Sequence, residues 1–448
     1  MNFTQKYADW FRHLLPSPFS IAILLTLLTF FISLFVSEKS TSILLLDWQA
    51  GLWQSNLLAF AFQMLLMLVL GHALALSTFF DKLISSLVHP IKTTGQAAAI
   101  VTISTILVAF LNWGLGLIFG AIIARKIGES FTKNQLPLNY PLIGAAGYVG
   151  LMVWHGGLSG SALTKVAENG HIQQIASNSS LPEAIYYGDT VFSAMNMTAF
   201  GLLLVLIPVT FYKIGNKSKY AIPAINSVII SDEKNVNLQG AEHIDHLQIL
   251  SKTIGALLLG LAIFMAVSID GPALSFITPN FINFTMLALC LLLHKNFSAF
   301  LSAIDDAIKG SSAILIQFPL YFGILALMQS GGLIEIISNW FIAISTTKTL
   351  PIFTFFSAGV VNVFVPSGGG QWAIQGPIIL DAATKLNVPL SKMILALAYG
   401  DQLTNMLQPF WALPLLSITG LKAKDILPYT LILLLIGMGV FMGVLLAF

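Results

Sequence analysis

One acidic residue lies inside a long stretch of the sequence that carries no other charge. Asp401 is the only charged residue between positions 392 and 422, and Gln402, Asn405 and Gln408 follow it closely. In one continuous helix, positions 401, 405 and 408 would share a face. A carboxylate in lipid must contact protein, water or a cation, so it either holds a proton or binds a cation such as Na⁺. We interpret these four residues as candidate cation-coupling residues. A structural, hydrogen-bonded aspartate is the alternative.

Two glycine-containing breaks interrupt apolar segments. Residues 112–116 read NWGLG, and residues 366–377 read PSGGGQWAIQGP. Irregular backbone at membrane depth must be buried in protein or line a wet cavity, and paired breaks in two halves of a chain indicate a transporter's binding site. A helix that starts at such a break presents unpaired N–H groups, which suit a carboxylate. The candidate substrate-binding residues are therefore Asn112, Trp113, Gly114, Gly116, Ser367, Gly368, Gly369, Gly370, Gln371 and Trp372.

The first break has an alternative interpretation, and the second break has further polar residues beside it. Gly116 and Gly120 fit a Gly-x-x-x-Gly face, so the first break could be a glycine-packed helix crossing. At the second break, Ser367 and Gln371 would add neutral donors for the carboxylate. Asn362, just before that break, would join the cation-coupling residues.

The elements that position these residues must span a membrane. Of 448 residues, 56% are hydrophobic and only 9% are charged, whereas soluble domains carry about 25% charged residues. Several uncharged runs near 20 residues are long enough to cross a bilayer as helices. The composition predicts an all-α integral membrane protein, a polytopic helix bundle. A net charge of +2 gives no indication of nucleic-acid binding, and the single cysteine, Cys290, excludes a disulfide within the chain.

The chain divides into two similar halves. Four features recur in order at a nearly constant spacing, which indicates duplication; the pairs are Gln63 and Gln317, 93–94 and 346–347, Asn112 and Asn362, and Tyr148 and Tyr399. With a cytoplasmic N-terminus, most of the 21 Lys and Arg residues face the cytoplasm and the halves are inverted. We predict a first repeat at 1–212 with a re-entrant hairpin at about 97–124, a cytoplasmic linker at 213–251, a connecting transmembrane helix at 252–268, and a second repeat at 269–448 with a hairpin at about 350–384.

These motifs together resemble the bacterial short-chain fatty acid transporter family, the acetoacetate and butyrate uptake type. The matching stretches are 70–75, 112–116, 364–370, 375–377, 399–402 and 405–414. Two residues depart from the pattern that the resemblance implies. Glu would be expected where this chain has Asp401, and glycine would be expected where it has His155.

The resemblance implies a carrier in the cytoplasmic (inner) membrane of a bacterium, with an elevator-like mechanism and assembly as a homodimer. Moving one charge across 100 mV costs about 2.3 kcal/mol, so uptake of an anion into a negative-inside cell favours coupling to a cation. We expect H⁺- or Na⁺-coupled transport of a small monocarboxylate such as acetoacetate or butyrate. The expected partners are this substrate and the lipid bilayer, without nucleic acid. We expect no cofactor besides the coupling ion.

Two other functions are weighed against this carrier. A channel for small anions would need a continuous wet path, which paired opposing hairpins do not favour. An intramembrane serine protease would use Ser159, in the pattern Gly-x-Ser-Gly, with His294 as its base. We expect a transporter and not an enzyme. The sequence leaves open the coupling ion, the acyl-chain length, uptake against export, and the roles of His72 and His155.

Overall fold

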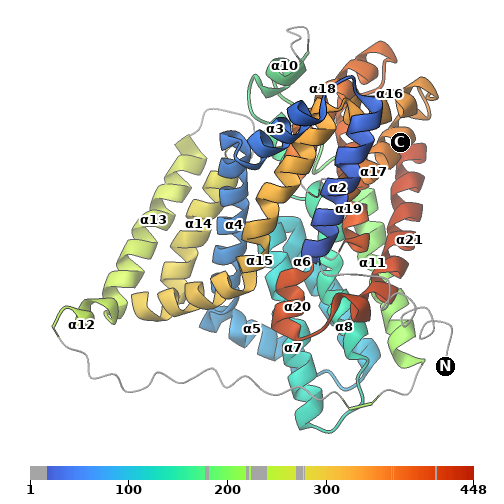
Figure 1. Cartoon of the computed structure of the whole chain (residues 1–448). Helices are drawn as coiled ribbons and strands as arrows, with labels where there is room; N and C mark the ends of the chain where they lie inside the picture. The colour runs from blue at the N-terminus through green and yellow to red at the C-terminus, as the bar shows by residue number, and fades with distance from the viewer. Residues whose placement is uncertain are drawn as a thin grey trace.

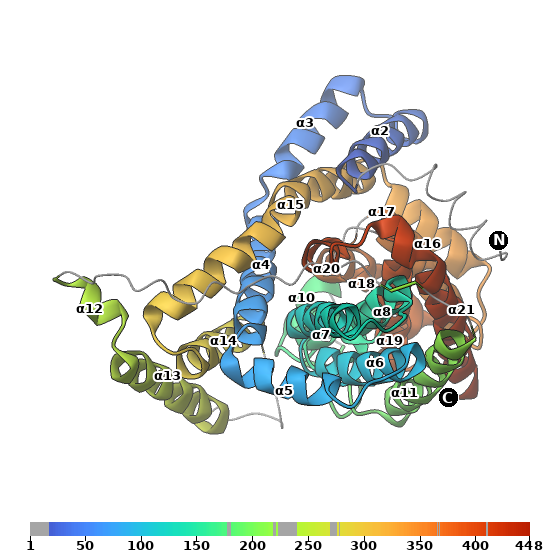
Figure 2. The same ribbon diagram turned by 90° about the horizontal axis from the view of Figure 1, so that it is seen from below.

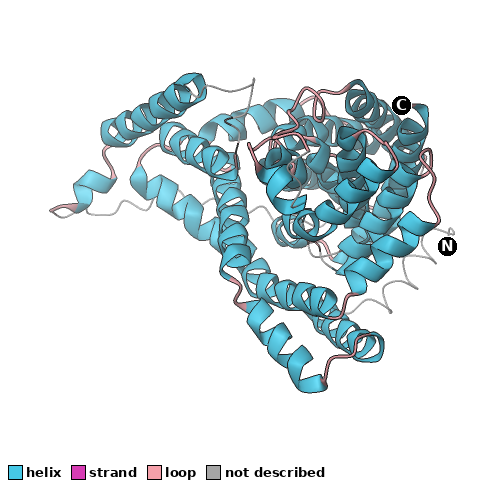
Figure 3. Ribbon diagram, turned by 90° about the horizontal axis from the view of Figure 1, so that it is seen from above, coloured by secondary structure: helices cyan, strands magenta, loops and turns pink. Residues whose placement is uncertain are grey.

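Helices make up the regular structure of the chain (Figure 1). This computed structural model describes residues 18–176, 181–217, 221–222, 240–268, 276, 278–364, 366, 368–408 and 411–448. Figure 3 shows helices and connecting loops, and no strand among the described residues. The predicted all-α class is confirmed. The cytoplasmic N-terminus and most of the linker at 213–251 lie outside the described residues and stay predictions.

The elements follow one another in an order that repeats. In the first half they are α2 (Pro18–Val36), α3 (Thr41–Leu52), α4 (Ser55–Ala75), α5 (Thr78–Val88), α6 (Thr94–Leu111), α7 (Trp113–Lys133), α8 (Tyr140–Tyr148), the 3-10 helices η1 (Val149–Met152) and η2 (Trp154–Gly156), α9 (Ser161–Val166), α10 (His171–Ala176) and α11 (Ala194–Asn216). They continue with α12 (Glu242–Asp245), α13 (Gln248–Ser268), α14 (Pro279–Leu293), α15 (Phe297–Ser330), α16 (Leu333–Ala343), α17 (Leu350–Phe364), α18 (Gly368–Lys385), α19 (Leu390–Thr404), the 3-10 helix η3 (Asn405–Leu407), α20 (Leu413–Thr419) and α21 (Ala423–Ala447).

The two halves share a sequence of element types. A long helix, a short helix, a broken helix pair and a helix that tightens into a 3-10 turn occur as α4 to η1 and again as α15 to η3. This recurrence fits the predicted duplication. The inverted orientation of the two halves stays a prediction.

Each broken pair folds back on itself. In α6 and α7, a Cβ added to Gly116 would lie 2.5 Å from Ala109 Cα, so the residues on either side of the break are in contact. In α17 and α18, Gln371 Nε2 donates to the Ala358 carbonyl at 2.8 Å. Both pairs are helical hairpins by these contacts. Their turning back within the membrane stays a prediction.

The helices form two groups (Figure 2). One is a bundle that holds both hairpins together with α8, α11, α19, α20 and α21. The other is an arm of α2, α3, α4, α13, α14 and α15, which packs on the bundle through α4 against α7 and through α15 against α20. The candidate site residues lie in the bundle.

Five described segments are long and apolar enough to span a membrane. They are Thr94–Leu111, Tyr140–Val166, Ala194–Asn216, Gln248–Ser268 and Ala423–Ala447. Shorter apolar helices accompany them at Ala22–Val36, Asn280–Leu293, Leu315–Ser330 and Leu350–Phe364. These segments support the predicted polytopic membrane bundle.

The segment that carries Asp401 is not one helix. α19 ends at Thr404, η3 follows it, Gln408 has an extended backbone, and α20 begins only at Leu413. The expectation that Asp401, Asn405 and Gln408 share one face of a continuous helix is therefore wrong, because the helix unwinds between the first and the last of them.

Candidate functional site

Asn112 forms the first break between α6 and α7. Its backbone is extended (φ −151°, ψ 125°), and its Oδ1 accepts the Leu115 N–H at 2.8 Å. Its carbonyl accepts the Gly116 N–H at 2.9 Å, and Ser159 Oγ accepts the Trp113 N–H at 2.9 Å. Three N–H groups at the start of α7 are thus bonded within the protein. These bonds occupy the N–H groups of Trp113, Leu115 and Gly116, and the binding of a carboxylate by amides at this break stays a prediction.

The glycines of the first break serve packing. A Cβ on Gly114 would lie 3.0 Å from the Met67 carbonyl of α4, and a Cβ on Gly116 would overlap Ala109 of α6. Their lack of a side chain lets α7 approach both helices closely. These close approaches fit the glycine-packed crossing that the sequence left open for Gly116 and Gly120, and a Cβ on Gly120 would likewise overlap the Gly147 carbonyl.

Three buried side-chain donors remain at this break. Among the described residues, Asn112 Nδ2, Trp113 Nε1 and Trp154 Nε1 are buried and have no hydrogen-bond partner. The bond to Leu115 N–H fixes the Asn112 amide so that its Nδ2 points elsewhere. The ring centroids of Trp113 and Trp154 lie 6.0 Å apart, and Asn112 precedes Trp113 in the chain. Buried donors are costly unless bonded, and three neutral N–H groups suit a monoanion.

The second break lies against the same region. Gly368 begins α18, and a Cβ added there would come within 2.7 Å of His155 Cε1 and 3.0 Å of Trp154 Cη2. Gly369 and Gly370 complete the first turn of α18. Trp154 and His155, whose rings stack with centroids 4.6 Å apart, therefore link both breaks. Ser367 lies outside the described residues, and its role stays a prediction.

Two further residues of the second break hold the hairpin in place. Gln371 Nε2 donates to the Ala358 carbonyl at 2.8 Å and to Gln375 Oε1 at 2.7 Å. Trp372 Nε1 donates to His171 Nε2 of α10 at 3.1 Å. The amide N–H groups of Gln371 are bonded inside the protein here, and its role as a donor to a carboxylate stays a prediction.

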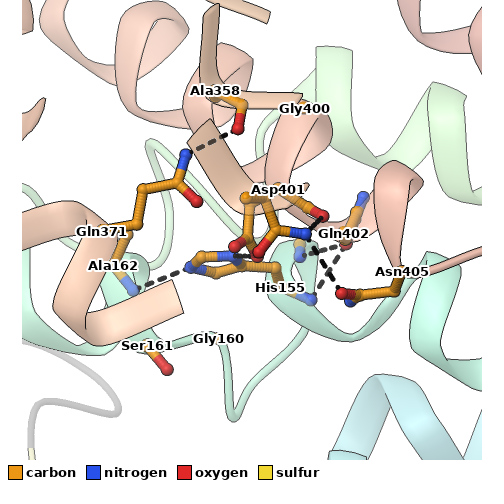
Figure 4. A network of polar contacts seen from close by, with 12 residues as sticks. His155, Gly160, Ser161, Ala162, Ala358, Gln371, Gly400, Asp401, Gln402 and Asn405 are labelled. Carbon is orange, nitrogen blue, oxygen red and sulfur yellow. Dashed lines mark hydrogen bonds and ion pairs between the residues drawn. The ribbon is translucent and has the colours of Figure 1, made fainter. Parts of the chain in front are cut away.

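Asp401 contacts a histidine that the sequence analysis did not assign. Figure 4 shows the His155 imidazole between Asp401 and Ala162. His155 Nδ1 lies 2.5 Å from Asp401 Oδ2, and His155 Nε2 accepts the Ala162 N–H at 3.0 Å. The side chains are 0% and 1% exposed. Two signals were present in the sequence: positions 155 and 401 both depart from the pattern that the resemblance implies, and His155 precedes a glycine-rich stretch at 156–161.

The other predicted coupling residues gather around this pair. Gln402 Oε1 accepts the backbone N–H of His155 at 2.9 Å. Asn362 Nδ2 donates to the Asp401 carbonyl at 2.8 Å and to Asn405 Oδ1 at 3.2 Å. Gln408 Nε2 donates to the Asn362 carbonyl at 2.5 Å. The fold thus brings together the coupling residues by side-chain bonds, although the helix is broken.

Of the residues that the structure describes, three near the coupling residues and the second break have an amide oxygen without a hydrogen-bond partner. Within the described ranges, Asn362 Oδ1, Gln371 Oε1 and Gln408 Oε1 are buried and have no hydrogen-bond partner. The orientation of each amide is fixed by the bonds of its nitrogen. No group of three or more His, Cys, Asp or Glu residues that could hold a metal ion occurs in the part of the chain that the structure describes. The Na⁺ expected near Asp401 stays a prediction.

The residues of the alternative protease are bonded elsewhere. Ser159 Oγ accepts the Trp113 N–H, and His294 Nε2 lies 2.8 Å from the Ala73 carbonyl. A nucleophile and its base must be within hydrogen-bond reach of each other. These contacts give Ser159 and His294 structural roles.

Comparisons with known proteins give the following matches. A family model described as "Short chain fatty acid transporter" matches residues 2–448. A protein of Escherichia coli (strain K12), named as a short-chain fatty acid transporter, is 37% identical over 428 residues, which are 94% of this chain and 93% of that protein. A protein of the same name from Haemophilus influenzae (strain ATCC 51907 / DSM 11121 / KW20 / Rd) is 34% identical over 440 residues, 96% of this chain and 94% of that protein.

A solved structure shows a more distant likeness. The Alcanivorax borkumensis YdaH transporter gives a TM-score of 0.46 at 14% identity, with 96% of this chain and 98% of that chain covered. This likeness is too distant to add to the sequence matches. The sequence matches agree with the resemblance expected from the motifs.

Proposed function

The chain belongs to the short-chain fatty acid transporter family, and from this premise we propose that it carries small monocarboxylates such as acetoacetate or butyrate across the bacterial cytoplasmic membrane. Membership of this family also makes it a transporter and not an enzyme. The direction that we propose is uptake, driven by a co-transported cation.

The observation that supports a carboxylate site is the set of unpartnered donors at the first break. Asn112 Nδ2, Trp113 Nε1 and Trp154 Nε1 are buried without partners among the described residues. A carboxylate offers two oxygens with about four lone-pair sites, enough for all three donors. Because the donors are uncharged, they suit weak binding of a monoanion better than tight binding of a dianion.

Aromatic rings beside these donors form an apolar wall for the acyl chain. The centroids of Trp113 and Trp411 lie 5.2 Å apart, and those of Phe318 and Trp411 lie 6.0 Å apart. A short acyl chain gains about 0.8 kcal/mol for each buried CH₂. We propose that this wall sets the preferred chain length.

The mechanism that we propose is alternating access with cation coupling. An anion that enters a negative-inside cell works against about 2.3 kcal/mol per 100 mV, and a co-transported cation removes that cost. Trp154 contacts Trp113 at the first break and Gly368 at the second, so the two hairpins could move together in the elevator-like cycle that we propose.

Counterflow of radiolabelled butyrate in proteoliposomes tests this function. A hydrogen bond to a charged group contributes about 1.5–3 kcal/mol, so Trp113→Phe and Trp154→Phe should each raise the half-saturating concentration roughly tenfold or more. Trp53→Phe is the matched control, because Trp53 is 60% exposed and lies in the arm. Equal affinities in all three variants would refute the carboxylate site. Ohmic current without counterflow would favour a channel.

A further inference from the structure

The contact between His155 and Asp401 points to the identity of the coupling ion. We propose that Asp401 carries one proton in each transport cycle, and that His155 is a positioning residue that holds its carboxylate. This inference rests on the proposed transport function. It assigns a role to His155 and selects the proton over Na⁺.

The geometry requires a hydrogen atom between the two side chains. His155 Nδ1 and Asp401 Oδ2 lie 2.5 Å apart, which is within hydrogen-bonding distance and too close for two atoms with no hydrogen between them. Both side chains are buried, so water does not compete for the contact. One hydrogen atom therefore lies on this line in the resting state.

Ala162 determines which ring nitrogen carries that proton. Its backbone N–H donates to His155 Nε2 at 3.0 Å, so the lone pair of Nε2 is occupied and this nitrogen is unprotonated. A second proton on the ring would direct an N–H group at another N–H group. The imidazole therefore stays neutral with its proton on Nδ1, and Asp401 bears the negative charge.

No cation contacts this charge in the part of the chain that is described. The helices packed around the pair are α6, α9, α17, α18, α19 and α21, with η1 and η3. Their titratable side chains, besides Asp401, are Lys165, Asp381, Lys385, Lys392, Tyr399, Lys424, Asp425 and Tyr429. Lys165 pairs with Glu168, Lys385 pairs with Asp381, and the Tyr399 hydroxyl donates to Asn196.

A buried carboxylate without a contacting cation is costly, and a proton on its second oxygen removes the charge. In the proposed cycle one proton from outside forms an O–H bond on Asp401 while the substrate carboxylate binds. Both leave on the inner side, where the O–H bond breaks, and the empty carrier returns with Asp401 ionised. The loaded site and the empty site each carry one negative charge. One complete cycle therefore moves no net charge, and the accumulation of substrate at equilibrium follows the pH gradient and not the membrane potential.

The first experiment separates this inference from the proposed function. Purified full-length protein in proteoliposomes is first assayed for butyrate counterflow at the same pH on both sides. Uptake is then measured with the outside more acid than the inside, with the outside more alkaline, with a Na⁺ gradient, and with a K⁺ diffusion potential. Rates in protein-free vesicles are subtracted, since butyric acid permeates lipid. We expect counterflow in the wild type, stimulation of uptake by external acid alone, and counterflow without acid-driven accumulation in Asp401→Asn. Absence of counterflow would refute the transport function. Counterflow with Na⁺-driven accumulation would overturn only the proton assignment.

Two substitutions at His155 then separate positioning from proton carriage. His155→Asn places an N–H near the position of Nδ1 and has no titrating ring, whereas His155→Gln places an acceptor near Nε2 and gives Asp401 no donor. We expect His155→Asn to keep the pH dependence of uptake. In His155→Gln the pH of half-maximal uptake should rise, because the ionised carboxylate of Asp401 loses the N–H donor that stabilises it. A flat profile in His155→Asn would show that the imidazole carries the proton. If both variants lose folded protein and the molecules that do fold keep the wild-type pH of half-maximal uptake, the contact is only structural. Either of these results overturns the inference.

Discussion

Gly368, the first residue of α18, lies directly against the imidazole ring of His155. A Cβ at position 368 would stand 2.7 Å from His155 Cε1 and 3.0 Å from the Trp154 ring, closer than real Cβ atoms pack. The start of the second hairpin is therefore in contact with the buried pair of His155 and Asp401 and with the ring nearest the first hairpin. A substitution of Gly368 should therefore displace both the His155–Asp401 pair and the Trp154 ring.

We expect Gly368→Ala to reduce transport strongly while the protein still inserts and folds. The added methyl group must displace the imidazole or the start of α18, and a misplacement of about 1 Å can cost roughly 100-fold in a positioned site. Gly439→Ala is the matched control, because a Cβ there meets nothing within 4 Å. Initial uptake rates normalised to folded protein check this, and equal rates in the two variants would show that the contact has no role in transport.

Asn112→Asp should separate helix capping from binding at the first break. The carboxylate keeps an oxygen for the Leu115 N–H, so the start of α7 is preserved, but it removes the Nδ2 donor and adds a negative charge. We expect butyrate affinity to fall at least about tenfold, while the cap of α7 is kept. Asn112→Ala should in addition lose roughly 0.5–2 kcal/mol of stability with the cap. Wild-type affinity in Asn112→Asp would contradict the assignment of Nδ2 as a substrate donor.

His155 and Asp401 should behave as a coupled pair under double substitution. The family resemblance implies glycine and Glu at these positions, and the two residues are in direct contact here. Residues in contact show interaction energies of about 0.5–3 kcal/mol. We expect His155→Gly and Asp401→Glu each to impair acid-driven uptake, and the double variant to recover part of it, because the longer Glu can fill the space of the ring. Strictly additive losses would contradict a functional link between the two positions.

His171 should make folding stability depend on pH through its bond with Trp372. Burial lowers the pKa of His171 below its ordinary value, and the ammonium of Lys165 lowers it further. The Trp372 N–H donates to its Nε2, which requires a neutral ring. Because the folded-state pKa is depressed, the stabilisation is present above the unfolded value of about 6.5 and is lost as pH falls through the folded-state pKa.

Thermal unfolding in detergent checks this last prediction. From about pH 7.5 to about pH 5 the wild type should lose more melting temperature than His171→Gln, by a few degrees, because Gln accepts the Trp372 bond without titrating. Parallel pH curves for the two proteins would exclude the contact as the source of the difference.

Local patterns in the sequence predicted where the two broken helix pairs lie. The hairpin predicted at about 97–124 compares with Thr94–Leu111 and Trp113–Lys133, and the one at about 350–384 compares with Leu350–Phe364 and Gly368–Lys385. The break at Asn112 was also predicted. These features depend on glycine, proline and charge within a short stretch, which a sequence displays directly.

Contacts between distant segments were not predicted. The bond between His155 and Asp401 joins residues 246 positions apart, and no periodicity connects them. Ser159 removes a free amide at the first break through a contact that is equally invisible in the sequence. The unwinding after Thr404 did have a signal, because Pro409 disfavours helix at Gln408. The apparent i, i+4, i+7 pattern was given more weight than that proline.

The most direct test is a cryo-EM map of the protein with bound butyrate. We expect the carboxylate oxygens within about 3.2 Å of at least two of the three donors Asn112 Nδ2, Trp113 Nε1 and Trp154 Nε1. A carboxylate bound instead at the amides of Gly368, Gly369 and Gly370, with these donors still unoccupied, would contradict the proposed site.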